Sequence, residues 1–331
     1  MYRSPSFPAT GFLELVWSLH RFSAEGLIAT IDIDRYNPAA ILKPVPGSTM
    51  TRPSASSAFP QDIEFQKLLA RQEDIDLTVA ALELARDAQP ELDFTSTLNW
   101  IDDRVEELSP QITRSQNERD SLQILAECLA GQHGLQGDES CFQRAEASYL
   151  NHVITSGRGL PISLSLVYLA VGERVGLSMF GVSAPYHFLV RCETASGPIF
   201  LDAYFGGRLM SSDDCIEKIC QYGELTPEQA SQKLGPASAR EIIVRMLNNL
   251  KMLFARRKEW EAAWKVQERL TALQPASYHQ RRDRALLALR SERNGLATTL
   301  LQQCLQDGPS EENEVLETQL RQAYSNLARW N

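Results

Sequence analysis

Residues 161–207 read PISLSLVYLAVGERVGLSMFGVSAPYHFLVRCETASGPIFLDAYFGG, and this stretch decides the fold. Pro161 suits a first helical turn, where its missing N–H would have no partner, and the run after it is apolar on nearly every side. Gly176 is placed to end that helix. Two strand-like segments follow at 180–192 and 199–204, joined by a short polar turn. We therefore expect a buried helix followed by an antiparallel hairpin.

A histidine and an aspartate fall inside the expected hairpin. His187 lies in its first strand and Asp202 in its second, so the two can be cross-strand neighbours. A histidine oriented by a carboxylate is the base half of a nucleophilic triad. Ser163, at the start of the helix, is the nearest hydroxyl. Two interpretations remain open: a Ser163–His187–Asp202 triad, and a structural His–Asp pair with Ser163 capping its own helix.

Composition limits the classes of function. The chain of 331 residues has a formal net charge of −9, which argues against general nucleic-acid binding. We find neither a signal-peptide pattern nor an apolar run near the ~20 residues of a membrane span, so we expect no membrane association.

The six cysteines are scattered, without C-x-x-C spacing or a histidine at ligand spacing. They indicate reduced thiols in a cytoplasmic protein, and no metal or cofactor site is evident. Three of them, Cys141, Cys192 and Cys215, are candidates for a displaced nucleophile, but we interpret them as small buried residues.

The chain divides into three parts. Residues 1–60 are rich in Pro, Ser and Thr, and we expect a poorly ordered extension in which Met50 is a candidate start of the mature chain. Residues 61–235 contain a helical lead-in followed by the stretch quoted above. In the lead-in, Pro110 is expected to end a helix, and the glycine-rich residues 132–142 are expected to form a loop.

Residues 236–331 are expected to be helical throughout and contain an internal repeat. Ala263 and Ala297 are 34 residues apart, and so are Pro275 and Pro309. A small residue where two helices cross, with a proline closing the second helix, is typical of a tetratricopeptide unit. The last helix is expected to cap the stack.

Positive charge is concentrated in this repeat region. Residues 240–293 contain 13 Lys or Arg against 6 Asp or Glu. This excess indicates docking of the repeat region, either within the protein or to a protein or peptide partner with an acidic surface; the alternative is the solvated faces of ordinary helices. The candidate partner-binding cations are Arg256, Arg257, Lys258, Arg281, Arg282 and Arg284.

Three segments resemble a known family. They are SYLNHVITSGRGLPISLSLVYLAVGERVGL (148–177), GVSAPYHFLVR (181–191) and IFLDAYFGG (199–207). They resemble the transglutaminase-like superfamily, and more closely its bacterial SirB-type branch with C-terminal tetratricopeptide repeats. The resemblance covers roughly residues 65–320. It implies an α+β fold: a helical N-terminal part, a papain-like core with a central helix packed on a small antiparallel sheet, and an all-α repeat region.

In active members of that superfamily a cysteine begins the central helix, and the histidine and aspartate follow on two strands. Matched to this pattern, His187 and Asp202 take the last two places, while residues 161–163 hold no cysteine, as is usual in the SirB-type branch. The chain also has PYHF where the branch has PGHF, so Tyr186 is expected to narrow the space before His187. The resemblance implies a non-catalytic interaction, scaffold or regulatory protein; the alternative is a hydrolase or acyl-transferase using Ser163.

Overall fold

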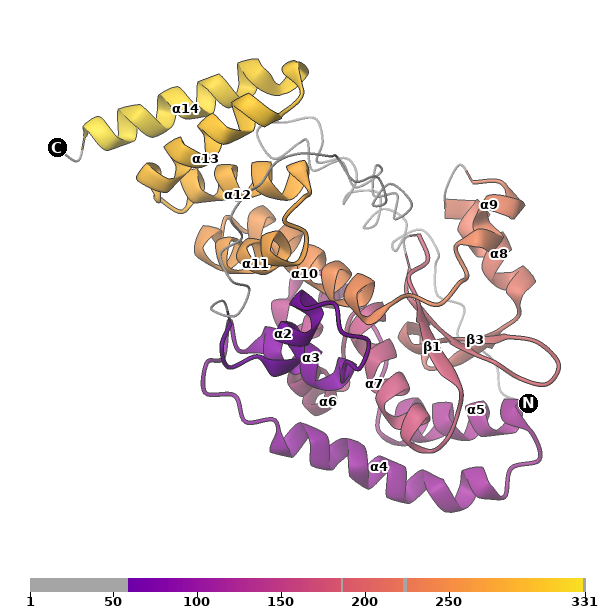
Figure 1. Ribbon diagram of the computed structural model, residues 1–331. Helices are drawn as coiled ribbons and strands as arrows, with labels where there is room; N and C mark the ends of the chain where they lie inside the picture. Colours follow the sequence, from indigo (N-terminus) through magenta and orange to yellow (C-terminus); the bar gives the residue numbers. More distant parts are fainter. Residues whose placement is uncertain (1–58, 186, 223–224, 330–331) are drawn as a thin grey trace. The chain divides into compact units, whose positions relative to one another are not determined.

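The core of the structure is a four-stranded antiparallel sheet surrounded by helices, seen in a computed structural model (Figure 1). The described residues are 59–185, 187–222 and 225–329. The expected N-terminal extension with Met50, up to residue 58, lies outside them, and so does Tyr186. Within the described residues, no helix is both long enough and apolar enough to cross a bilayer.

The secondary structure follows the order expected from the sequence. The helices before the sheet are α2 (Ile63–Leu69), α3 (Leu77–Ala85), α4 (Thr95–Thr113), α5 (Glu118–Ala126), η4 (Glu127–Gln132), η5 (Glu139–Gln143), η6 (Ala145–Ser148), α6 (Leu150–Ser156) and α7 (Pro161–Arg174). The strands are β1 (Met179–Val182), β2 (Leu189–Cys192), β3 (Ile199–Asp202) and β4 (Arg208–Met210), with η7 (Ala203–Phe205) between the last two. The helices after the sheet are α8 (Ser212–Tyr222), α9 (Pro227–Gln232), α10 (Ala239–Arg256), α11 (Trp260–Leu273), α12 (Tyr278–Arg290), α13 (Asn294–Asp307), η8 (Ser310–Glu312) and α14 (Asn313–Ala328).

Helix α7 is the central helix predicted from the sequence. Every residue from position 161 to 172 is buried, which is what an all-round apolar helix requires. Gly176 ends it at φ 90°, and the amides of Gly176 and Leu177 bond back to Glu173 and Gly172. These two bonds make a Schellman motif, and its left-handed residue is most easily a glycine.

The expected strand 180–192 is two strands, and this corrects the sequence-based prediction. Its halves, β1 and β2, pair with each other, and β2 pairs with β3 in the expected hairpin. The break contains Pro185, which has no N–H to donate to a ladder. His187 therefore lies in the connection before β2 rather than inside a strand.

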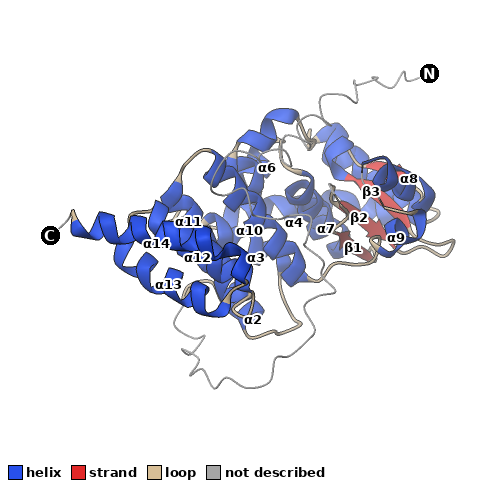
Figure 2. Ribbon diagram, turned by 90° about the horizontal axis from the view of Figure 1, so that it is seen from above, coloured by secondary structure: helices blue, strands red, loops and turns tan. Residues whose placement is uncertain are grey.

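Helices cover both faces of this sheet (Figure 2). Phe200 of β3 belongs to an apolar cluster with Cys215 and Ile219 of α8 and Ala230 of α9. The next residue, Leu201, points to the opposite face and is also completely buried. That side is covered by α7, which contacts β1 and β2.

The lead-in departs from the sequence-based prediction at two places. Helix α4 continues through Pro110. Proline has no N–H, so the carbonyl of Glu106 loses its usual hydrogen-bond donor. Because Glu106 is exposed to solvent, water can bond to this carbonyl instead. Ser109 and Gln111 also donate side-chain hydrogen bonds to carbonyls of the same turn. Further on, the expected loop 132–142 is interrupted by η5, and the helix before it ends as the π-helix η4.

The C-terminal helices show the predicted 34-residue periodicity. Helices α10 and α11 form one antiparallel pair, α12 and α13 form the next, and α14 packs on α13 at the end of the stack (Figure 1). Ala263 of α11 and Ala297 of α13 are both completely buried at equivalent positions. Small side chains at these positions let neighbouring helices approach closely.

A buried arginine joins the first repeat to the lead-in helices. Arg269 of α11 is 1% exposed, and its guanidinium bonds to the carboxylates of Asp62 and Asp87, each at 2.7 Å. The same guanidinium lies over the rings of Phe59 and Phe65. Because buried charges must be paired, this contact sets how α11 meets α2 and α3.

We expect Arg269→Met to lower the free energy of unfolding by about 3 kcal/mol, because it removes the buried cation that Asp62 and Asp87 share. Arg321→Met, at an exposed position on α14, is the matched control. Urea denaturation followed by circular dichroism measures both. A loss below about 1 kcal/mol for Arg269→Met, the range of an exposed ion pair, would contradict this role.

Candidate functional site

The connection that carries His187 is held by an arginine of the repeat region. Arg245 of α10 donates to Ser183 Oγ and Ala184 O, each at 2.8 Å, and to His187 O at 3.0 Å. The amide of His187 also bonds to Ala184 O at 3.3 Å. These bonds fix the backbone on which the imidazole stands, so its position depends on α10 as well as on the sheet.

The predicted pair of His187 and Asp202 is formed. His187 Nε2 lies 2.8 Å from Asp202 Oδ1, and the two side chains are 6% and 0% exposed. Since an ionised carboxylate only accepts hydrogen bonds, Nε2 carries the hydrogen. The second carboxylate oxygen, Oδ2, accepts from Lys218 Nζ of α8 at 2.9 Å, a partner that sequence patterns did not reveal.

Asp202 is held in its ionised form. Burial by itself raises the pKa of this carboxyl, but His187 and Lys218 outweigh burial through their charge and hydrogen bonds. The pKa of Asp202 therefore lies well below its usual range. The site thus contains an oriented imidazole whose carboxylate partner is charged at any ordinary pH.

The Ser163 hydroxyl is bonded to backbone carbonyls of its own helix start and of the segment before it. The side chain is completely buried, and Oγ donates to Ala147 O at 2.5 Å and Leu160 O at 3.1 Å. A hydroxyl has a single proton, which these two carbonyls already share. The structure therefore brings His187 and Asp202 together but uses the Ser163 hydroxyl to tie the start of α7 to the preceding segment.

The cysteine thiols are all free, and five of the six are buried. Burial raises the pKa of Cys128 and Cys215 to about 12, and that of Cys192 to about 11; it also raises the pKa of Cys141. Only the thiolate form of cysteine is an effective nucleophile. This burial agrees with the interpretation of Cys141, Cys192 and Cys215 as packing residues.

The surroundings of His187 are aromatic and partly open. The rings of Tyr204 and Phe205 each lie 6.3 Å from the imidazole, and Phe205 is 45% exposed. The ammonium of Lys218 sits 4.8 Å from the centre of the Phe205 ring. His187 and Tyr204 are each only 5% exposed, so Phe205 and not the imidazole forms the accessible surface here.

The six candidate partner-binding cations separate into two groups. Arg282 is 4% exposed and pairs with Asp283 and Glu312, and Arg284 forms two hydrogen bonds to Glu268. Arg281 is half-buried and donates to the carbonyls of Pro275 and Ala276 in the turn between α11 and α12. These three arginines stabilise the repeat stack itself.

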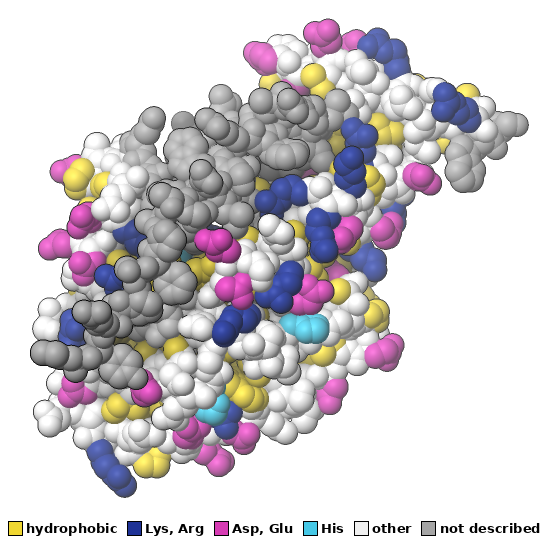
Figure 3. All heavy atoms as spheres, turned by 180° about the vertical axis from the view of Figure 1, so that it is seen from behind, with side chains coloured by type: hydrophobic (Ala, Val, Ile, Leu, Met, Phe, Trp, Pro, Cys, Tyr) yellow, Lys and Arg dark blue, Asp and Glu magenta, His cyan; other side chains and the backbone are white. Residues whose placement is uncertain are grey.

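By contrast, Arg256 at the end of α10 and Arg257 and Lys258 in the turn after it are exposed. Arg257 lies 3.2 Å from Glu259, also exposed, and Arg256 reaches Phe142 O at 3.4 Å. On the face shown in Figure 3, Lys and Arg side chains are interspersed with Asp and Glu and do not form one basic patch. Part of the excess positive charge counted along the sequence therefore forms ion pairs within the protein.

We expect Asp202→Asn to destabilise the protein by about 3 kcal/mol at neutral pH, because it removes a buried charge that accepts hydrogen bonds from His187 and Lys218. The folded-state pKa of Asp202 lies below its unfolded value, so the stabilisation is complete above the unfolded pKa of about 4 and is lost as pH falls further.

Urea denaturation from pH 7 to pH 3 tests this, with Asp213→Asn, exposed on α8, as the control. The difference in free energy of unfolding between wild type and Asp202→Asn should become smaller below pH ~4. A difference that stays constant or widens on acidification would contradict the assignment.

Comparison with known proteins agrees with this architecture. The family described as "Transglutaminase-like superfamily" matches residues 95–248, and the family described as "Tetratricopeptide repeat" matches residues 250–322. A UPF0162 protein of Xylella fastidiosa is 32% identical over 249 residues, which are 73% of this chain and 87% of that protein.

More distant relatives match fewer residues of the chain. Protein SirB1 of Salmonella typhimurium is 25% identical over 230 residues, 66% of this chain and 84% of SirB1. F-box only protein 21 of Mus musculus is 29% identical over 130 residues, 37% of this chain and 20% of that protein. No solved structure matches the chain. The resemblance to SirB-type proteins is thereby confirmed, and the chain belongs to the UPF0162 family, with a transglutaminase-like segment followed by tetratricopeptide repeats.

Proposed function

We propose that this protein is a non-catalytic, cysteine-lacking transglutaminase-like protein that works as an interaction or regulatory module. The observation that carries the proposal is the Ser163 hydroxyl, buried and bonded to the carbonyls of Ala147 and Leu160. A general base acts only on a proton within hydrogen-bond reach, and the proton of Ser163 is committed elsewhere. His187 and Asp202 then serve as a structural pair that fixes the connection before β2.

The energetics of the pair favour this structural role. Asp202 is completely buried and takes hydrogen bonds from both His187 and Lys218, which belong to different elements. Removing a buried charged partner is costly whether or not a reaction takes place, so the pair is retained after loss of the nucleophile. The alternative, a hydrolase or acyl-transferase, is favoured only by the geometry of the imidazole and its carboxylate.

The repeat helices supply the partner-binding part of the proposal. Stacked helix pairs leave a concave surface that suits a helix or an extended peptide. The match of residues 250–322 to the tetratricopeptide-repeat family supports this use of α10–α14. Within this region we assign contact with an acidic partner to Arg256, Arg257 and Lys258, because their side chains are exposed.

A fluorophosphonate probe tests the catalytic alternative. We expect no covalent labelling of the purified wild-type protein, because a serine without a base at its hydroxyl is a poor nucleophile. Mass spectrometry of the probe-treated chain is the measurement, with an active serine hydrolase in the same tube as the positive control. Labelling at Ser163 that disappears in His187→Ala would establish the enzyme and end the non-catalytic proposal.

Charge reversal tests the acidic partner. At low salt, wild-type protein should retain its partners from an extract of its own cells. We expect Arg257→Glu combined with Lys258→Glu to abolish binding of these partners, because like charges then repel across the interface. Arg119→Glu, exposed on α5 and remote in sequence from the repeats, should retain them. The same partners bound by the double variant at the same salt concentration would refute the assignment.

A further inference from the structure

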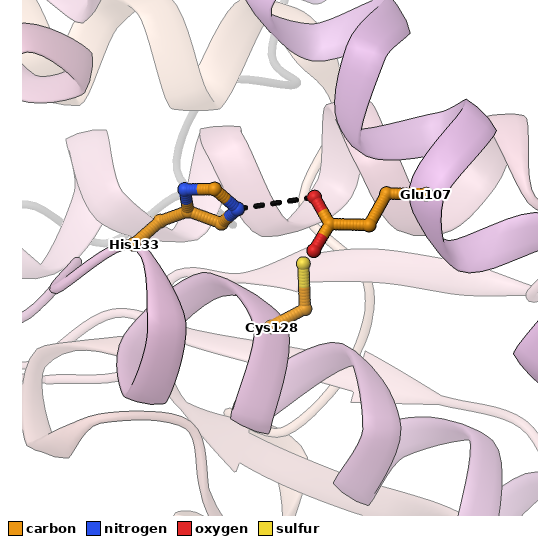
Figure 4. Close-up of side chains that lie close together, drawn as sticks. All are labelled: Glu107, Cys128 and His133. Atoms are coloured by element: carbon orange, nitrogen blue, oxygen red, sulfur yellow. Dashed lines mark hydrogen bonds and ion pairs between the residues drawn. The ribbon is translucent and has the colours of Figure 1, made fainter.

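Three side chains with metal-binding atoms meet on the lead-in helices, outside the His187 site. They are Glu107 of α4, Cys128 of the π-helix η4, and His133 directly after η4 (Figure 4). Their ligand atoms all lie within 4.8 Å of one another. His133 Nε2 is 3.1 Å from Glu107 Oε2, and the other carboxylate oxygen points towards the Cys128 sulfur (Figure 4).

The π-helix is what brings the cysteine and the histidine together. In an α-helix, residues five apart are separated by about 140° around the axis and point in different directions. In η4 the amide of His133 bonds to Cys128 O at 3.0 Å, the i→i+5 pattern of a π-helix. The wider turn places both side chains on the face that looks at α4. Single π-turns inside helices occur frequently at functional sites, so this one points to a role beyond packing.

The spacing of the ligand atoms is close to that of a metal centre. With bonds of about 2.0–2.3 Å, neighbouring ligand atoms of a tetrahedral zinc site lie roughly 3–4 Å apart. The nitrogen and oxygen of the present cluster are already at 3.1 Å, and the largest separation is within 4.8 Å.

The donor set and its exposure indicate which ion fits. Coordination of a metal ion would deprotonate the Cys128 thiol, whose pKa burial raises, and release its proton to solvent. The resulting thiolate, with one imidazole and one carboxylate, suits a borderline-soft dication such as Zn²⁺ rather than Mg²⁺ or Ca²⁺, which prefer oxygen ligands. Cys128 is 2% exposed, whereas the side chains of His133 and Glu107 are 27% and 31% exposed. Solvent therefore reaches one side of the cluster, where water can complete four ligands.

Neighbouring residues hold two of the ligands in place. Arg104, one turn before Glu107, donates from Nε to Glu107 Oε2 at 3.0 Å. Trp100 packs edge to face on the His133 ring, with the ring centres 5.6 Å apart. Partners of this kind orient metal ligands and restrict their rotation. The carboxylate and the imidazole are thus held in position before any ion arrives.

We propose that Glu107, Cys128 and His133 form a binding site for one Zn²⁺ ion, with water as the fourth ligand. The ion joins α4 to η4. Directly after η4, Gln136 N bonds to Gly157 O, before α7, and Gly137 N bonds to Tyr204 O, after Asp202. Zinc at this position therefore restrains residues 133–137, which bond both to the turn before α7 and to the residues after Asp202. The proposal stands independently of whether the protein is catalytic.

The test uses the full-length protein, stripped with a chelator and kept reduced. Titration with ZnCl₂ in a calorimeter should show one site per chain. Co²⁺ in place of Zn²⁺ should give a thiolate-to-cobalt charge-transfer absorption and the visible bands of a tetrahedral ion. Cys128→Ser, His133→Gln and Glu107→Gln each remove one ligand. Substitution of outer partners commonly weakens metal binding about 10- to 100-fold, so loss of a direct ligand should weaken it by more than ~100-fold.

Cys141→Ser and His152→Gln are matched controls, since they remove a buried cysteine and a partly exposed histidine outside the cluster. Both should bind Zn²⁺ like wild type. Three results would overturn the proposal: no stoichiometric binding by wild type, equal weakening in the controls, or a cobalt complex without thiolate absorption. The cobalt spectrum of wild type decides the matter even if a ligand variant fails to fold.

Discussion

The fold depends on one constraint, the complete burial of an apolar helix in the middle of the chain. From position 161 to 172, no residue of α7 is exposed, so the rest of the chain must supply a cover on every side. The sheet covers one side, α3, α4 and α6 cover others, and α10 of the repeat region also touches it. Burying such a helix stabilises the fold through the hydrophobic effect, at a free energy of about 25 cal/mol per Å² of apolar surface.

Around this helix, buried charges fix how the elements meet. Asp202 joins β3 to the segment before β2 and to α8 through His187 and Lys218. Arg269 joins α11 to the lead-in helices through Asp62 and Asp87. In the repeats, Lys251 and Asp283 make a further buried pair at 2.9 Å. Each pair tolerates few other arrangements, because a displaced partner leaves a charge buried without compensation.

The same reasoning applies to His187, Asp202 and Ser163. An imidazole and a carboxylate that are buried together stabilise the fold through their contact, whereas a nucleophile at the start of α7 contributes only to a reaction. The Ser163 hydroxyl ties α7 to the carbonyl of Ala147, sixteen residues earlier. The His–Asp geometry alone is therefore weak evidence for activity, and the state of the hydroxyl is the more informative observation.

The sequence by itself determined the features that depend on local pattern. Apolar runs, prolines and glycines predicted α7, the β2–β3 hairpin, and the 34-residue repeat, because these signals act through backbone geometry within a few turns. The pairing of His187 with Asp202 was also predictable, since both lie near one hairpin. The strand break at Pro185 was missed because the residues on both sides of it are largely apolar, and this pattern predicted one continuous strand over 180–192.

Only the tertiary structure decided which side chains have partners. Lys218 bonds to Asp202, and Arg245 bonds to the connection that carries His187. Both lie on helices later in the chain, and no local sequence pattern marks them. From the sequence, Arg282 and Arg284 were candidate contacts for an acidic partner, but in the fold they form ion pairs with Glu312 and Glu268. The cluster of Glu107, Cys128 and His133 was invisible because five-residue spacing on an ordinary helix separates side chains. It arises only from the π-turn and the packing of α4, which are long-range consequences of covering α7.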